Sequence, residues 1–382
     1  MNRGVLRSTV CAFALVLSSA AVADPVPMPS MSGPLSANPN PMSFDAGPVG
    51  KIFVTGAVSG LGFWQSNAVS GDHDSWLDLD NGQVALQKTD GLIQFYVQAG
   101  AYSIPSLGTE YFKAGNMIDK TYGVVPQGFL KIVPTDNFSI EVGKLPTLIG
   151  DEYTFTFENM NIERGLLWNQ EPAVSRGVQA NFSTGPVSIS VSLNDGYYSN
   201  RYNWVSGSLA WTIDSENSLS VIGGGNFGRT GKSTFATPIA QNNGSIFNLI
   251  YTHTSGPWTI SPYFQYSHVP SDATLGIAHS ASTWGGAVLA SYSFNDNWKL
   301  AGRAEYIDSS GSFANGAPSL LYGPGSHAWS LTVTPTYQKG IFFARAEASY
   351  TGVGNSEPGF EFGKSFDKSS QTRLMLETGV LF

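Results

Sequence analysis

The sequence predicts a transmembrane antiparallel up-and-down β-barrel of about sixteen strands, with short periplasmic turns and long extracellular loops. Three observations predict it: many short segments alternate polar with apolar residues, tight turns alternate with long polar connections, and the chain ends on a one-sided strand. One face of that last strand, residues 371–382, carries Leu374, Leu376, Val380 and Phe382. Its other face is mainly polar, so one face of the strand suits lipid and the other suits water.

The N-terminal segment 1–23 has the pattern of a cleaved secretory signal peptide. Arg3 and Arg7 form a basic start, residues 10–16 an apolar core, and residues 21–23, Ala-Val-Ala, a small-residue cleavage site. Cys11, the only cysteine, lies in this segment. The mature protein is therefore expected to have no disulfide, no catalytic thiol and no cysteine-bound metal.

Residues 24–49 are rich in proline and have almost no apolar periodicity. We interpret this segment as a Pro-rich flexible periplasmic leader. A role in binding a periplasmic partner stays open as the alternative. The barrel is expected to occupy residues 50–382.

The composition limits the classes of protein to which this chain can belong. The chain has 28 acidic and 20 basic residues, a formal net charge of −8, which argues against a nucleic-acid partner. Beyond the signal segment no run of about eighteen apolar residues occurs, which excludes transmembrane helices. The 43 glycines, the 13% aromatic content and the low charge favour many strands and turns. Composition alone still allows two soluble domains or one large barrel.

The alternating segments suggest about sixteen strands, an even number as single-chain bacterial barrels require. They lie near residues 50–64, 76–88, 92–102, 127–133, 138–145, 174–184, 187–195, 203–213, 218–227, 245–254, 257–268, 282–293, 297–307, 327–338, 341–350 and 371–382. Short turns and long connections alternate between them. A soluble sandwich, or two soluble domains, has no reason to keep this order.

The two faces of these strands indicate which side meets water. In the strand near 327–338, small uncharged residues such as Thr332 and Thr334 oppose Leu331 and Val333. A polar face of this kind suits a wet lumen. The parity of apolar residues changes around Asn81-Gly82, which predicts a β-bulge there.

Aromatic residues recur near the strand ends, where they would form girdles at both membrane interfaces. They are Trp258, Tyr266, Trp284, Tyr292, Phe294, Trp298, Tyr306 and Tyr350.

The connection at about 146–173 is unusually apolar for an external loop, so we expect it to fold into the barrel. Here residues 145–150 (Leu-Pro-Thr-Leu-Ile-Gly), 159–165 (Asn-Met-Asn-Ile-Glu-Arg-Gly) and 169–172 (Asn-Gln-Glu-Pro) resemble the bacterial outer-membrane β-barrel porins of the OmpL-like, or type-2 barrel porin, family. The resemblance covers nearly all of the chain after the leader.

This resemblance implies an outer-membrane channel for passive diffusion of small hydrophilic solutes or ions. It implies outer-membrane lipid around the wall and recognition of the C-terminal strand, with its final Phe382, by the barrel-assembly machinery. It also implies a homotrimer, for which the sequence names no contact.

By analogy with general porins, the inward loop narrows the channel. Its charged residues are the candidates for the constriction: Asp151, Glu152, Glu158, Glu163, Arg164 and Glu171. Strand parity places a further set on the lumen wall: Lys299, Arg303, Glu305, Arg345, Glu347, Arg373 and Glu377. For each loop residue the alternative is an ion pair that anchors the loop to the wall.

Two other functions remain as alternatives. A barrel plugged by the inward loop would act as a surface receptor or adhesin. A barrel hydrolase ranks third, because neither a Gly-x-Ser-x-Gly nor a His-Glu-x-x-His pattern occurs. Asp72-His73-Asp74 is a weak metal signal, since three adjacent side chains on a strand do not converge on one ion. We therefore expect no catalysis, no metal and no cofactor.

Overall fold

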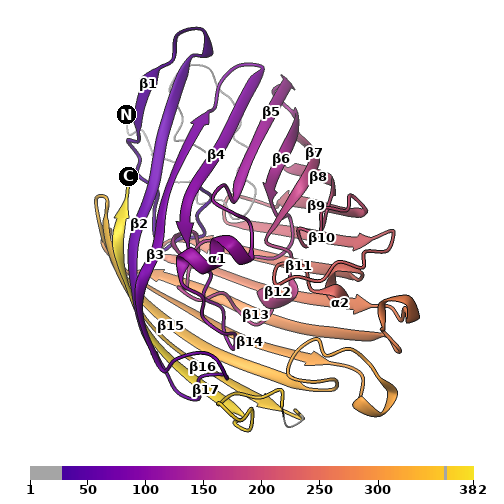
Figure 1. Ribbon diagram of the computed structural model, residues 1–382. Helices are drawn as coiled ribbons and strands as arrows, with labels where there is room; N and C mark the ends of the chain where they lie inside the picture. The colour runs from indigo at the N-terminus through magenta and orange to yellow at the C-terminus, as the bar shows by residue number, and fades with distance from the viewer. Residues whose placement is uncertain (1–27, 357–358) are drawn as a thin grey trace.

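The computed structural model describes residues 28–356 and 359–382, so the predicted signal peptide lies outside the described residues. Within these ranges sixteen antiparallel strands close into a barrel, and one further strand, β1, pairs with β2. Closure comes from pairing of the last strand, β17, with β2. Figure 1 shows the tilted strands side by side in the barrel wall. The predicted fold class is confirmed.

The strands follow the predicted order and lengths closely. They are β1 (Met42–Asp45), β2 (Lys51–Gln65), β3 (Ser75–Lys88), β4 (Ile93–Tyr102), β5 (Gln127–Thr135), β6 (Phe138–Pro146), β7 (Val174–Thr184), β8 (Val187–Asn194), β9 (Trp204–Thr212), β10 (Asn217–Asn226), β11 (Ser245–Ser255), β12 (Trp258–Val269), β13 (Ala281–Ser293), β14 (Trp298–Ser309), β15 (His327–Lys339), β16 (Phe342–Gly354) and β17 (Ser370–Leu381).

Helices are few and short. They are α1 (Ala114–Lys120), α2 (Ile239–Asn242) and the 3-10 turns η1 (Gly47–Val49), η2 (Thr156–Glu158), η3 (Trp168–Gln170), η4 (Ala273–Leu275) and η5 (Phe313–Asn315). In the part of the chain that the structure describes, no helix has the length and apolar character needed to cross a membrane.

The apolar side of the wall faces outward. On β15, Leu331 and Val333 are 55% and 49% exposed, whereas Thr332 and Thr334 are 2% and 0% exposed. Because a water-soluble sandwich would bury the apolar side instead, this inverted pattern marks a wall that meets lipid outside and polar groups inside.

Aromatic side chains form two rows on this wall. At the short-turn end the ring of Trp258 contacts that of Tyr292, and the ring of Trp298 contacts that of Tyr337. At the long-loop end the contacts are Trp284 with Tyr306 and Trp329 with Tyr350. Rows of this kind at both ends of the strands are typical of barrels whose aromatic girdles meet the two interfaces of a bilayer.

The bulge predicted around Asn81-Gly82 lies one residue earlier. Ser59 of β2 faces Asn81, but Gly60 faces Leu79, so Asp80 is the extra residue. Both Asp80 and Asn81 are buried, whereas Leu79 is on the exposed face. The bulge thus keeps the apolar parity on the outside and turns a carboxylate inward.

Backbone hydrogen bonds extend the closing seam to the last residue. The Phe382 amide donates to the Gly56 carbonyl at 3.0 Å, and the Gly56 amide donates to the Phe382 carbonyl at 2.9 Å. Beyond that point β1 takes over the same edge of β2, with Met42 opposite Val54. The edge of β2 is therefore paired past the end of β17.

Residues 28–49, the described part of the predicted leader, make contacts with the barrel. They include β1, and Leu35 is 1% exposed in an apolar cluster with the barrel residues Ala57, Phe343 and Leu381. Part of this segment thus packs inside the barrel.

Candidate functional site

The connection between β6 and β7, residues 147–173, lies inside the barrel; we call it the lumen loop. Its side chains Phe155, Ile162 and Leu167 are fully buried, among apolar groups of the wall and of the loop after β4. The apolar residues that made this segment unusual in the sequence thus form a core within the channel.

Three arginines of the wall hold the loop. Arg303 Nη1 lies 2.5 Å from Glu152 Oε1, and Arg373 Nη1 lies 2.6 Å from Glu163 Oε1. Arg345 donates to loop carbonyls, and its charge is balanced by Glu377 on the next strand. All six side chains are buried. Buried charges of this kind are tolerated only when paired, so these contacts set where the loop sits.

Two wall carboxylates accept hydrogen bonds from loop amides. Glu347 accepts from the amides of Ile162 at 2.5 Å and Glu163 at 3.0 Å. Glu305 accepts from the amides of Leu166 at 3.1 Å and Leu167 at 3.3 Å. A loop has no ladder partners for its amides, and charged acceptors on the wall supply them.

The bulge on β3 provides a further anchor. The Thr156 hydroxyl donates to Asp80 at 2.5 Å and lies 3.1 Å from Glu377 Oε1. Asn81 Nδ2 lies 2.7 Å from the same hydroxyl. The loop is thus fastened from β14 round the closing seam to β3.

The remaining predicted loop residues also lie in buried positions. Asp151 accepts from Ser261 of β12 at 2.6 Å, Glu158 from the Phe155 amide at 3.0 Å, and Glu171 from Tyr263 at 3.4 Å. Arg164 donates to the Pro105 carbonyl at 2.9 Å, and its Nε and Nη1 have no hydrogen-bond partner. All four are at most 7% exposed.

Burial shifts the titration of the loop acids. It raises the pKa of Asp151 to about 7 and the pKa of Glu158 to about 8, and it raises the pKa of Glu171 as well. Because Asp151 and Glu158 are desolvated and form no ion pair within the described part of the chain, their protonation changes near neutral pH instead of in the usual acid range.

The structure therefore gathers all six predicted loop residues with six of the seven predicted wall residues. Lys299 is the exception, because its ammonium contacts the leader, at the Pro34 carbonyl. The alternative that the sequence left open, ion pairs between loop and wall, is the geometry seen for Glu152 and Glu163. In the described residues, no group of three or more His, Cys, Asp and Glu is arranged to hold a metal ion.

One charged pair of the wall was missed in the sequence. Lys131 on β5 and Glu141 on β6 are cross-strand partners 3.3 Å apart, with side chains 31% and 13% exposed. The signal was present, because Lys131 stands between Leu130 and Ile132, and Glu141 between Ile140 and Val142. The parity argument applied to the C-terminal strands finds this pair equally well.

The inner faces of β7–β9 carry mostly small, uncharged polar groups, among them Gln179, Asn181, Ser190, Ser192, Ser206 and Ser208. At the long-loop end above this part of the wall, a cavity of about 510 Å³ is lined by Ser199, Asn200, Arg201, Gly231 and Lys232. The side of the barrel away from the loop anchors is thus polar, and the basic side chains Arg201 and Lys232 lie at its long-loop end.

Residues 51–382 match the model of the family described as "Putative beta-barrel porin-2, OmpL-like". The chain belongs to this porin family. It is an outer-membrane porin, as the resemblance in the lumen loop implied. Comparison with curated protein sequences finds no match.

Solved porin structures share the fold at low sequence identity. OmpT of Vibrio cholerae is 13% identical, with a TM-score of 0.58 over 90% of this chain and 100% of that one. The outer-membrane channel DcaP of Acinetobacter baumannii is 10% identical, with a TM-score of 0.57 over 87% and 97%. OmpF of Salmonella typhi is 12% identical, with a TM-score of 0.58 over 89% and 100%.

Proposed function

We propose that this porin is a narrow passive channel whose width is set by the lumen loop. Small hydrophilic solutes or ions cross between that loop and the inner faces of β5–β9. The observation that carries the proposal is the one-sided anchoring: buried ion pairs tie the loop to β14–β17, while the wall on the other side carries small polar groups. Diffusion through such a path involves no catalytic step.

In this proposal the charged loop residues are positioning residues. Glu152 and Glu163 hold the loop against the wall, and the accessible charges along the path are Lys131 and Glu141. For the assembly we propose a homotrimer inserted by the barrel-assembly machinery through its C-terminal strand. A trimer form of Vibrio cholerae OmpT, a porin of the same fold, supports the oligomeric state.

Reconstitution tests the channel. Purified full-length protein in planar bilayers is expected to give stepwise conductance without any energy source, because a barrel of this size encloses more space than its wall side chains fill. Deleting residues 152–170, most of the lumen loop, should raise each conductance step. Bilayers that stay silent with correctly folded protein would contradict the porin, and conduction only after the deletion would favour the plugged receptor.

Replacing Lys131 with glutamine tests the path. The change leaves Glu141 unpaired in the lumen and should shift the cation-to-anion permeability ratio about twofold toward cations. The measurement is the reversal potential under a KCl gradient. Lys339→Gln is the matched control, since it removes the same charge from an exposed strand end. If Lys131→Gln and the parent have the same cation-to-anion permeability ratio, β5 does not line the solute path.

A further inference from the structure

The leader segment 28–38, which we call the plug segment, lies within the short-turn end of the barrel. We propose that it is a tethered plug, a second barrier in series with the lumen loop, which narrows the channel at this end and widens it when displaced. The inference rests on the proposed channel function. It gives a role to the part of the chain for which the porin family match, residues 51–382, does not account.

Hydrogen bonds join the plug segment to three strands. Gln87 of β3 donates to the Met28 carbonyl at 2.7 Å, and Lys299 of β14 donates to the Pro34 carbonyl at 2.5 Å. Gln338 of β15 exchanges two bonds of 2.8 Å with the backbone of residue 36. All three side chains lie near the short-turn ends of their strands. The segment therefore runs from the β3 side of the opening to the β14–β15 side.

The plug segment also touches the lumen loop. The Ser32 amide and hydroxyl both reach the Glu158 carbonyl, at 2.8 and 3.1 Å. Leu35 belongs to the same buried cluster as Phe155 and Phe157 of the loop. The two elements thus share one apolar contact surface, and movement of the plug segment would uncover it.

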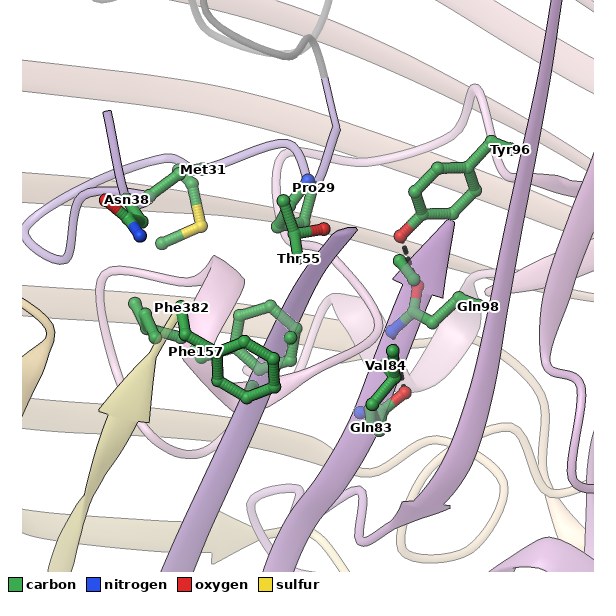
Figure 2. Close-up of a pocket in the computed structure, with 15 residues that line it drawn as sticks. Pro29, Met31, Asn38, Thr55, Gln83, Val84, Tyr96, Gln98, Phe157 and Phe382 are labelled. Carbon is green, nitrogen blue, oxygen red and sulfur yellow. Dashed lines mark hydrogen bonds between the residues drawn. The ribbon is translucent and has the colours of Figure 1, made fainter. Parts of the chain in front are cut away.

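The fit leaves little free space. Figure 2 shows Pro29 and Met31 of the plug segment and Phe157 of the lumen loop around one small cavity. Its volume of about 20 Å³ has room for roughly one water molecule. With the segment in place, the space between it, Phe157 and the wall at β2–β4 offers no path to a solute.

The plug segment is held differently from the lumen loop. Residues 28–41 contain no charged side chain, so no ion pair secures them, whereas the loop is held by buried pairs such as Arg373–Glu163. Proline at 29, 34, 39 and 41 stiffens the segment and lowers the entropy lost when it seats. Pairing of β1 with β2 keeps it at the rim. These properties suit an element that leaves and returns while the loop stays.

The test uses the full chain with Leu35→Asp, which places a charge in a site that is 1% exposed and should expel the segment. Asn40→Asp, at an exposed position of the same leader, is the matched control. Seating is read out with Ser32→Cys and a maleimide reagent, since Cys11, in the predicted signal peptide, is the only native cysteine. We expect the cysteine at position 32 to label slowly in the Ser32→Cys variant and in its combination with Asn40→Asp. It should label fast when Ser32→Cys is combined with Leu35→Asp.

The single-channel conductance of Leu35→Asp, and of a variant lacking residues 28–38, should rise about twofold or more over the parent and Asn40→Asp. A parent that conducts, with released variants that label fast but conduct no better, would overturn the plug and leave the porin intact. Fast labelling of Ser32→Cys in the otherwise unchanged chain would also overturn it. Silence of the parent and of every released variant would overturn the porin and the plug together.

Discussion

Replacing Arg373 with methionine should lower the free energy of unfolding by about 3–5 kcal/mol, the usual loss when one partner of a buried ion pair is removed. Arg373 is 2% exposed and donates to Glu163 at 2.6 Å, the Ser106 carbonyl at 2.8 Å and Gln65 at 2.8 Å. Methionine keeps much of the volume but leaves the Glu163 charge buried without its cation. Urea unfolding of the reconstituted barrel measures the change.

A second substitution separates the ion pair from packing. Glu163→Gln in the Arg373→Met background removes the stranded charge and should recover part of the stability. Arg229→Met is the control, because Arg229 forms an exposed ion pair with Asp272 in the loops, where solvent screens the charges. If both arginine substitutions cost the same, the buried network does not hold the loop.

Replacing Gly56 with alanine should impair closure of the barrel, with a stability loss of about 1–3 kcal/mol from overpacking. A Cβ atom at Gly56 would lie 2.4 Å from the Phe382 ring and 2.7 Å from the Gln83 carbonyl oxygen, closer than van der Waals contact allows. The ring can turn away, but the backbone carbonyl of β3 belongs to the sheet. The fraction of compact barrel on unheated SDS gels, together with urea unfolding, measures the loss.

Gly60→Ala is the matched control, because it lies on the same strand and its nearest atom, the Asp78 carbonyl oxygen, would be 3.8 Å from the new Cβ. It should fold as the parent does. Equal folding of the two alanine variants would show that the ring of the C-terminal phenylalanine does not need the space above Gly56.

Most of the barrel was predictable because its signals are local. Period-two alternation gives each strand and its two faces, and turn residues give the short connections, so the predicted segment 327–338 and β15 (His327–Lys339) nearly coincide. Even the bulge followed from a change of parity at Asn81-Gly82 and lies one residue away. The extra strand β1 was not predicted, because four residues in a Pro-rich leader are too few to show an alternation of polar and apolar side chains.

The sequence predicted which residues belong to the candidate site, but not which of them contact one another. Parity placed Arg303 and Arg373 on the lumen side, and apolar content brought the loop inside, yet both a constriction and a set of anchors fitted those facts. Only three-dimensional proximity distinguishes them. Glu163 meets Arg373 across 210 positions of sequence, and no local pattern encodes a contact of that separation.

What the sequence predicts and what only the folded structure shows differ because the forces involved act over different ranges. Alternation, turn chemistry and the aromatic end act over a few neighbouring residues, so the amino-acid order alone specified a lipid-facing barrel that closes on its last strand. Desolvation and ion pairing act between segments that meet only after closure. Only the folded barrel shows that Glu152 and Glu163 are buried against β14 and β17, that Lys131 and Glu141 stay accessible, and that the leader enters the lumen.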